Sequence, residues 1–349
     1  MTERSRTVPP KPVPGDRVAL LSPAAGLPAV YPRPFEEGVR RLIEDFGLKP
    51  VEYPTTRTMG ATPQERAADL HAAFADPEIK AIIASIGGDD QITVLPYLDA
   101  ELIRANPKPF FGYSDNTNLL MYLAELGIVG YHGACVMVEL GRPGAVHPLT
   151  EESFRAALFT TGEYELTPAA EFHDVERDWA DPATFDSEPE MEAGQGWHWH
   201  RPDRVVEGAA WGGCLEIVTD LLIAGRAVRP VEEFEGGVLF LETSEEMPSA
   251  RRVYRSLRAM GERGLLRRFP ALVMGRARAW SFEQPLDEAG RAAFRADQRA
   301  AVLRALAEYA PDTMAVFDVD LGHTDPQLVI PYGGLVRVDG PARRITVRY

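Results

Sequence analysis

The sequence predicts an α/β fold in which a doubly wound parallel-sheet domain is followed by a mixed α/β domain. From Gly15 onward, short β-rich runs alternate with amphipathic helical runs, which is the pattern of βαβ units. The chain has 349 residues, more than one ordinary hydrophobic core accommodates. The alternation is lost between 166 and 204. We therefore expect one domain over 1–165, a linker over 166–204 and a second domain over 205–349, with a small-ligand site in the cleft between the domains.

The first domain is expected to begin with a strand at 18–22 and a helix that stops at Gly47. A second helix starts at Pro63, behind Thr62, whose side chain suits a helix N-cap. A nearly all-apolar strand at 81–88 ends in a glycine pair, and such a strand suits a parallel sheet covered on both faces. The elements that follow are a strand at 108–114, a helix directly after it and a strand at 128–133.

The linker is rich in acids, Pro, Gly, Trp and His and has no sustained periodicity, so we expect a long loop there. Loops of this length are usually functional or disordered, and the tryptophans of this one argue against disorder. The second domain is expected to contain a strand at 236–242, a helix at 248–264, a strand at 270–280, a helix over about 288–309 and closing hairpin-like runs.

Composition excludes several classes of protein. The formal net charge is -15 and the basic residues form no stripe, so we expect no nucleic-acid partner. The two cysteines, Cys135 and Cys214, indicate neither a disulfide framework nor a zinc cluster, and a reducing cytoplasm is the simplest location. Prolines interrupt the N-terminus where a secretory signal needs an apolar helix, and no stretch is long enough to span a bilayer, so no membrane partner is expected.

Three side chains that could carry chemistry stand at the ends of apolar strands. Ser114 follows a buried strand and precedes a helix, the context of a nucleophile elbow, although the second glycine of G-x-S-x-G is missing. Glu242 ends the strand at 236–242, and His323 follows a strand through a glycine. A hydroxyl nucleophile needs a base, and the base needs a carboxylate to hold its tautomer, so the set is chemically complete. We expect none of the three in the hydrophobic core.

Each of these residues also has an ordinary explanation. Ser114 or Asp115 could simply cap the following helix, because both residue types are good N-caps. Glu242 could be a surface residue at a strand end, and His323 a solvent-facing loop histidine. Spacing alone does not prove that the three side chains meet.

Four motifs follow one another along the chain: I-G-G-D-D (86–90), G-Y-S-D-N-T (112–117), L-E-T-S-E (241–245) and G-H-T-D-P-Q-L-V-I-P-Y-G (322–333). In this order they resemble the LD-carboxypeptidase family of serine peptidases, and within it the microcin C self-immunity branch. The resemblance runs from the entrance strand of the first domain to the final hairpin. Two departures, the missing elbow glycine and a glycine pair followed by two aspartates, bear on subfamily.

The resemblance implies an N-terminal Rossmann-like domain that carries the nucleophile Ser114, and a C-terminal domain that carries the general base His323 and its partner Glu242. It implies a homodimer and an oxyanion hole made by the backbone N–H groups of Gly88 and Asp115, with Gly87 not separable from Gly88. No cofactor and no metal are expected. The pair His198 and His200 lacks a convincing third ligand.

Two substrates fit this family resemblance: a peptidyl or aminoacyl nucleotide, and the murein tetrapeptide of wall recycling. The linker favours the nucleotide, because Trp179 and Trp197 resemble the Trp-bearing loop of the immunity branch and an indole can stack on a base for about 1–3 kcal/mol. The alternative is that these tryptophans pack the linker onto the domains. A catalytically silent ligand-binding protein is the possibility from another class, and the complete set of reactive residues argues against it.

Overall fold

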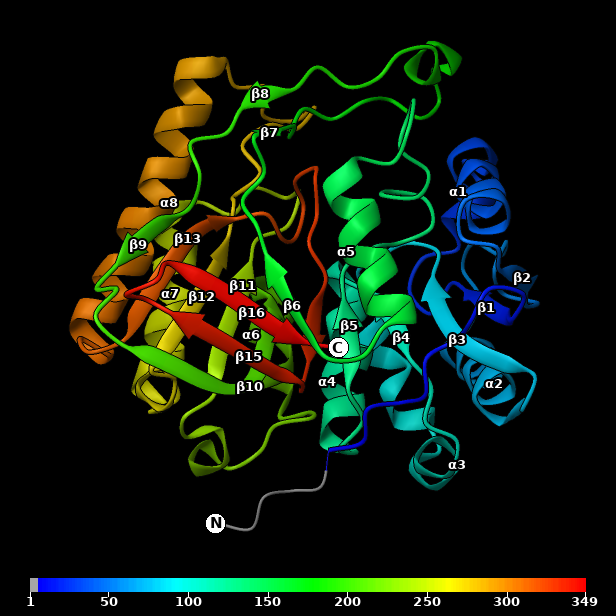
Figure 1. The fold of residues 1–349 in the computed structure, drawn as a ribbon, viewed down its shortest axis with the longest axis horizontal. Helices are drawn as coiled ribbons and strands as arrows, with labels where there is room; N and C mark the ends of the chain where they lie inside the picture. Colours follow the sequence, from blue (N-terminus) through cyan, green and yellow to red (C-terminus); the bar gives the residue numbers. More distant parts are fainter. Residues whose placement is uncertain (1–5) are drawn as a thin grey trace.

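The computed structural model describes residues 6–349 and shows two sheet-and-helix bodies side by side (Figure 1). Within these residues the strands form a six-stranded sheet, an eight-stranded sheet and a two-stranded ribbon, which we call the first sheet, the second sheet and the linker ribbon. Parallel strands alternate with helices in both bodies, so the predicted α/β fold class is confirmed. One hydrophobic cluster includes residues of both sheets, which packs the two bodies against each other.

The first sheet has the strand order β14-β5-β4-β3-β1-β2. Strands β1 to β5 run parallel, and β14 joins β5 antiparallel. The chain reverses its direction of progress across the sheet between β1 and β3, and ligands of open α/β sheets bind outside the carboxyl ends of the strands at such a switch point. The strands are β1 (Arg17–Leu21), β2 (Lys49–Glu52), β3 (Ile79–Ala84), β4 (Phe110–Gly112), β5 (Gly130–His132) and β14 (Ile330–Tyr332).

The helices of the first body include three that the sequence predicted and two, at 100–105 and 148–159, that it did not. Thr62 caps α2 as predicted: its hydroxyl accepts from the N–H of Glu65, and the Glu65 carboxylate accepts from the N–H of Thr62, which completes a capping box. The strand predicted at 81–88 ends at Ala84, so the glycine pair lies in the loop after β3. The helices are α1 (Pro32–Glu44), α2 (Pro63–Ala75), α3 (Ala100–Ala105), α4 (Thr117–Glu125) and α5 (Pro148–Phe159).

The second sheet has the order β6-β16-β15-β10-β11-β12-β13-β9. Its strands β10 to β13 are parallel, whereas β15, β16 and β6 follow one another antiparallel on the far side of β10. The strands are β6 (Glu163–Leu166), β9 (His198–His200), β10 (Val205–Cys214), β11 (Val238–Glu242), β12 (Ala271–Gly275), β13 (Met314–Val319), β15 (Leu335–Asp339) and β16 (Arg344–Arg348).

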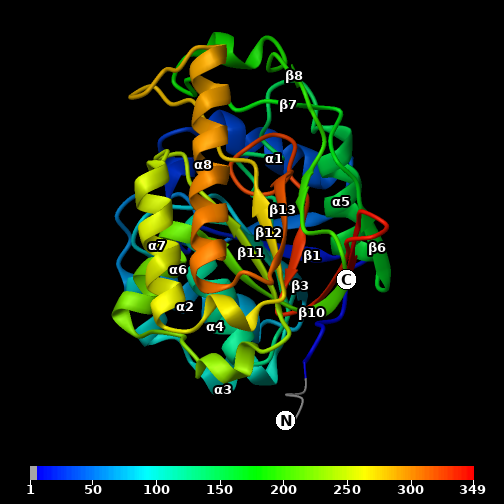
Figure 2. The same cartoon turned by 90° about the vertical axis from the view of Figure 1, so that its left-hand side faces the viewer.

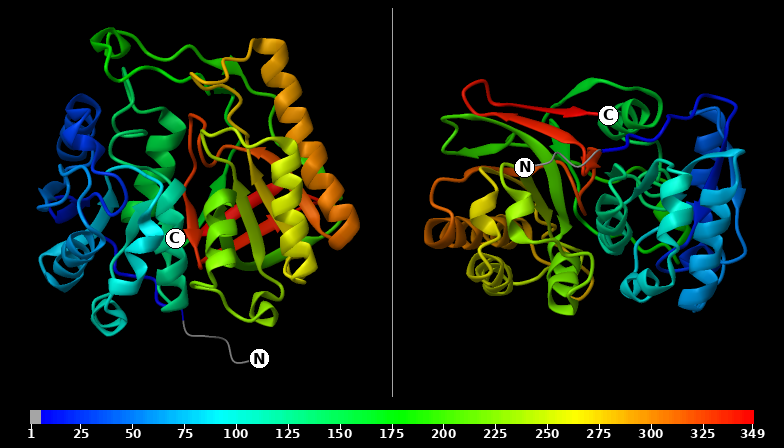
Figure 3. Two further views of the ribbon diagram at one scale, coloured as in Figure 1. Left: turned by 180° about the vertical axis from the view of Figure 1, so that it is seen from behind. Right: turned by 90° about the horizontal axis from the view of Figure 1, so that it is seen from below.

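Three helices lie side by side against the second sheet (Figures 2 and 3). They are α6 (Leu215–Ala224), α7 (Ala250–Glu262) and α8 (Glu288–Tyr309). The helix predicted over about 288–309 is confirmed, and Asp287 caps it by accepting from the N–H of Gly290.

The linker passes over the top of both bodies in the view of Figure 1. The expected loop contains three short strands: β7 (Glu171–Phe172) and β8 (Glu192–Ala193) form the linker ribbon, and β9 extends the second sheet beside β13. The strand before the linker, β6, already belongs to the second sheet, where it pairs with β16.

One further crossing joins the two bodies. After β13 the chain leaves the second sheet and enters the first sheet as β14, where Ile330 pairs with His132 of β5. The segment between β13 and β14 therefore runs along the junction of the two bodies, and it contains His323.

Candidate active site

Ser114 occupies the turn between β4 and α4. Its backbone φ is +60°, in the left-handed region that costs an L-residue other than glycine about 1–2 kcal/mol. Such strain persists only where the surroundings over-determine the backbone, which is common at functional sites. A strained serine between a buried strand and a helix has the backbone geometry of a nucleophile elbow.

The elbow is held against the loop that follows β3. A Cβ added to Gly87 would lie 2.9 Å from Cβ and 3.0 Å from Oγ of Ser114, so this close approach requires a glycine. Asn116, which stands where G-x-S-x-G has its second glycine, donates to the carbonyl of Ile86 at 3.0 Å. Burial raises the pKa of Asp115 to about 6, and its carboxylate accepts from the N–H of Gln91 at 2.9 Å.

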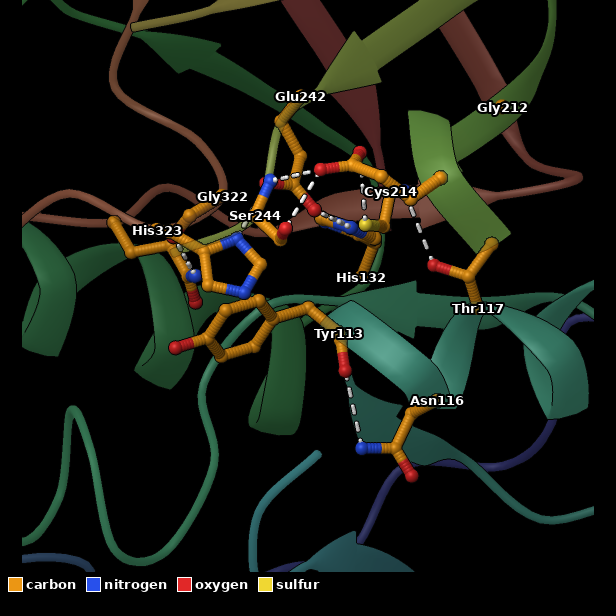
Figure 4. A network of polar contacts seen from close by, with 12 residues as sticks. Tyr113, Asn116, Thr117, His132, Gly212, Cys214, Glu242, Ser244, Gly322 and His323 are labelled. Atoms are coloured by element: carbon orange, nitrogen blue, oxygen red, sulfur yellow. Dashed lines mark hydrogen bonds and ion pairs between the residues drawn. The ribbon is translucent and has the colours of Figure 1, made fainter. Parts of the chain in front are cut away.

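Glu242 and His323 meet across 81 residues of sequence (Figure 4). Nδ1 of His323 lies 2.6 Å from Oε2 of Glu242, at the end of β11. Because an ionised carboxylate can only accept, Nδ1 carries the proton. The expectation that none of the three residues is in the core is wrong for Glu242, which is fully buried.

Two features of the crossing segment allow this contact. Gly322 has a φ of +88°, and a Cβ there would lie 2.4 Å from Oε2 of Glu242. Gln327 ties the segment down, because its amide nitrogen donates to the carbonyl of Gly322 at 2.6 Å and its amide oxygen accepts from the N–H of Ala134 at 2.5 Å. The position of His323 is therefore set by contacts from both bodies.

The second nitrogen of the His323 ring faces another acid, Glu245, at 3.0 Å. Burial of His323 disfavours its charged form, but Glu242 and Glu245 together outweigh burial and hold the pKa of His323 well above its ordinary value. Burial also raises the pKa of Glu245, yet the charge of His323 prevails and lowers it to about 2. The sequence motif L-E-T-S-E includes Glu245, but the contact of Glu245 with His323 depends on the tertiary structure.

The environment behind the pair is apolar and aromatic. His132 is fully buried, and burial lowers its pKa to about 4, so its ring is neutral at pH 7. Its Nε2 lies 3.8 Å from Oε1 of Glu242. The ring of Tyr113, next to Ser114 in sequence, meets the His323 ring edge-on with 5.1 Å between centroids. The motif G-Y-S-D-N-T includes Tyr113, but its contact with the imidazole depends on the tertiary structure, and no sequence signal marked His132 as part of the site.

The structure thus pairs Glu242 with His323 and brings Tyr113, the neighbour of Ser114, against the same imidazole. Within residues 6–349, Oγ of Ser114 makes no hydrogen bond to a protein atom, and Nε2 of His323 is held by Glu245 instead. The arrangement supplies a serine hydroxyl on a strained backbone, an imidazole hydrogen-bonded to a carboxylate, and a glycine loop beside the serine.

Family models match both bodies. A model of the LD-carboxypeptidase N-terminal domain matches 18–133, and a model of the LD-carboxypeptidase C-terminal domain matches 207–338, so together they span most of the chain. The chain belongs to the LD-carboxypeptidase family. It is accordingly a serine peptidase.

Individual relatives of this LD-carboxypeptidase family member differ in how much of the chain they match. Microcin C7 self-immunity protein MccF of Escherichia coli is 26% identical, over 95% of this chain and 93% of that protein. Murein tetrapeptide carboxypeptidase of Pseudomonas aeruginosa is 34% identical, over 41% of this chain and 46% of that protein. The solved structure of MccF in complex with aspartyl sulfamoyl adenosine superimposes with a TM-score of 0.85 at 23% identity, covering 98% of both chains, which establishes a shared fold.

The two linker tryptophans of this LD-carboxypeptidase family member lie in different places. Trp197 donates from Nε1 to the buried carboxylate of Asp320 at 2.9 Å, and Arg276 donates to the same carboxylate. Trp179 lies edge-on to Tyr31 of the first body, with 5.9 Å between ring centroids. Both indoles are half-buried, and Trp197 has the more specific anchor.

The described part of the chain, residues 6–349, contains no group of three or more His, Cys, Asp or Glu side chains placed to hold a metal ion. His198 faces Asp318 at 3.5 Å across the edge of the second sheet. Over the same residues no helix is long and apolar enough to cross a membrane.

Proposed function

We propose that this LD-carboxypeptidase family member hydrolyses an amide through Ser114, His323 and Glu242, by way of an acyl-enzyme. The observation that carries the proposal is the buried hydrogen bond between Glu242 and Nδ1 of His323, on an imidazole that contacts the residue before a serine held in a strained elbow. A carboxylate that fixes Nδ1–H leaves Nε2 as the nitrogen that takes the serine proton. Tyr113 supports the assembly, because it contacts the imidazole and directly precedes the nucleophile.

The proposed steps follow from these positions. His323 accepts the proton of Ser114 while Oγ attacks the scissile carbonyl, and then returns the proton to the leaving nitrogen. Water enters the acyl-enzyme by the same route, with His323 as base. Glu242 remains ionised throughout and stabilises the imidazolium that forms in each step.

The oxyanion donors of this mechanism are the backbone N–H groups of Gly88 and Asp115. The carbonyl of Gly87 accepts from the N–H of Ala25 at 3.1 Å, so in a trans peptide the N–H of Gly88 points the opposite way. Among residues 6–349 this N–H donates to no protein atom, which leaves it available to a substrate oxygen. The Cβ position of Gly87 lies 3.5 Å from the nitrogen of Asp115, so the two proposed donors flank one point.

The proposed substrate is an aminoacyl or peptidyl nucleotide of the microcin C type. Two findings support it: the similarity to MccF spans both bodies and the linker, and the half-buried indole of Trp179 makes no hydrogen bond to any residue over 6–349. We propose Trp179 as the better candidate for base stacking, and Trp197 as a second. We also propose that the protein forms a homodimer and that it is located in the cytoplasm.

Murein tetrapeptide is the second candidate, favoured by the 34% identity with the Pseudomonas aeruginosa enzyme over the matched part. A side-by-side assay on murein tetrapeptide and on an aminoacyl sulfamoyl adenosine separates the two. We expect the higher kcat/KM on the nucleotide, and the reverse order would select murein recycling. Failure of a folded sample to hydrolyse either compound, and to label with a serine-directed probe, would favour a silent binding protein.

A further inference from the structure

Glu245 occupies the nitrogen of His323 that the proposed mechanism needs. Its Oε2 lies 3.0 Å from Nε2, while Nδ1 is held by Glu242. In this arrangement the imidazole has an acid on each side, and Ser114 has no access to the base. Glu245 must therefore leave Nε2 before the serine proton can be transferred.

The side chain of Glu245 is free to move, although its backbone is fixed. Its exposed fraction is 53%, whereas the side chains of Glu242 and His323 are 0% and 7% exposed. The preceding residue, Ser244, donates from its backbone nitrogen at 3.0 Å and from its hydroxyl at 2.6 Å to Glu216, which anchors the loop. A rotation of the Glu245 side chain alone can thus open the base.

The charges around His323 determine whether the Glu245 carboxylate can rotate away without a new partner. Glu242 and Glu245 both face His323, with the neutral ring of His132 and the ring of Tyr113 behind it. Glu245 stays ionised at neutral pH, and Arg278 adds a weaker positive charge to its surroundings. A carboxylate that gives up a charge-assisted partner requires another cation to compensate, because an unpaired charge in a partly buried site is costly.

The position of that cation follows from the chemistry. The scissile carbonyl must sit beside Oγ of Ser114, and Oγ must reach Nε2, so the two groups bonded to the carbonyl, the leaving nitrogen and the α-carbon, arrive on the side where Glu245 stands now. An ammonium on that α-carbon is the cation that such a substrate can bring to this carboxylate.

We propose that Glu245 is a specificity-determining residue: it closes the base in the free protein and exchanges Nε2 of His323 for an ammonium group adjacent to the scissile carbonyl. The inference deepens the proposed function and rests on it. It names the substrate class as aminoacyl compounds with a free α-ammonium, and it disfavours peptidyl compounds in which that nitrogen is acylated.

The test uses two covalent probes that need neither nucleotide nor murein, a diphenyl α-aminoalkyl phosphonate and its N-acetylated counterpart. Oγ of Ser114 attacks phosphorus, a P–O bond forms, the bond to phenoxide breaks, and the proton passes through His323 to the departing phenol. We expect the protein to label at least about tenfold faster with the ammonium probe, as expected for a close charge pair. Glu245→Gln should slow this probe and speed the acetylated one, so that the ratio approaches one.

Glu246→Gln is the matched control, because it removes the same charge from the next residue, which is exposed and does not contact His323. This variant should keep the ratio of the unmodified protein. If Glu245→Gln slows both probes equally, or if the unmodified protein labels at the same rate with both probes, the role proposed for Glu245 is wrong. The proposed serine chemistry is unaffected by either result. If neither probe labels Ser114, the proposed serine chemistry fails first and the inference falls with it.

Discussion

Ser114 is positioned by one short stretch of backbone, whereas His323 is positioned by side chains from distant parts of the chain. The serine owes its place to the strained turn after β4 and to the glycine loop beside it. The histidine depends on Glu242 from β11, Gln327 from its own crossing segment and Glu245 from the loop after β11. The half of the site that carries the proposed nucleophile is thus a local structure. The half that carries the proposed base, the base half, exists only in the complete tertiary fold.

The largest expected effect tests both halves together. Ser114→Ala, Glu242→Ala and His323→Ala should each lower kcat by about 10⁴-fold or more, with double variants little worse than singles, since such residues act as a unit. Thermal unfolding then separates the halves. Glu242→Ala should destabilise the fold by about 1–3 kcal/mol, because it leaves the buried Nδ1–H of His323 without its acceptor, whereas Ser114→Ala should not. Near-native turnover of Ser114→Ala would remove the central claim.

The next largest effect concerns two glycines, one beside Ser114 and one beside Glu242. Gly87→Ala would press on Ser114, and Gly322→Ala would press on the Glu242 carboxylate, so each should lower kcat/KM by about 10²-fold through misplacement of the reacting groups. Gly60→Ala is the control for Gly322→Ala, because Gly60, like Gly322, has a positive φ, +70°, but open space around its Cβ position. If Gly60→Ala lost as much activity, backbone strain rather than crowding would explain the result.

The base half should also determine the pH profile. The two acids raise the pKa of His323, so the acid limb of kcat/KM should lie above pH 6.5, the ordinary value for histidine, and activity should rise with pH through it. In the substrate complex Glu245 should have left Nε2 of His323, which removes one anion from the imidazole. The acid limb of kcat should therefore lie at lower pH than the acid limb of kcat/KM. Glu245→Gln should move the kcat/KM limb to lower pH, because His323 loses one of its two anionic partners. Coincident limbs in both proteins would contradict this.

The linker tryptophans sharpen the same contrast between local and tertiary roles. Trp179→Ala should weaken the binding of nucleotide-bearing substrates by about 1–3 kcal/mol and leave kcat/KM on plain peptides unchanged. Trp197→Phe should instead lower the free energy of unfolding by about 1–3 kcal/mol, because it leaves the buried Asp320 with one donor fewer. Equal losses on both substrate classes in Trp179→Ala would show that this indole only packs the linker.

The smallest effect isolates the strain in the elbow. Ser114→Gly should be more stable than Ser114→Ala by about 1 kcal/mol in chemical denaturation, because glycine adopts the left-handed backbone without the Cβ penalty. Both variants lack the nucleophile, so the difference reports on the backbone alone. Equal stability would mean that the turn relaxes when the hydroxyl is removed.

Sequence reasoning located many of the elements and singled out three candidate reactive residues, because their signals are local. The capping box at Thr62, the helix at 288–309 and the strand that leads into Ser114 each follow from periodicity and terminal residues within a few positions. The end of β3 was placed too late, because the apolar run continues into a loop that packs beside the elbow. The strand β9 was missed, since it is stabilised by pairing with β13 and not by its own pattern.

What the sequence by itself determined is therefore the α/β fold class, the order of the elements, and the candidacy of Ser114, Glu242 and His323. Only the tertiary structure decided that β14 crosses into the first sheet and brings His323 to Glu242, that His132 and Tyr113 lie behind the pair, and that Glu245 holds Nε2. The physical reason is range. Periodicity and capping act over a few residues, whereas a carboxylate and an imidazole 81 residues apart meet only when two sheets have packed.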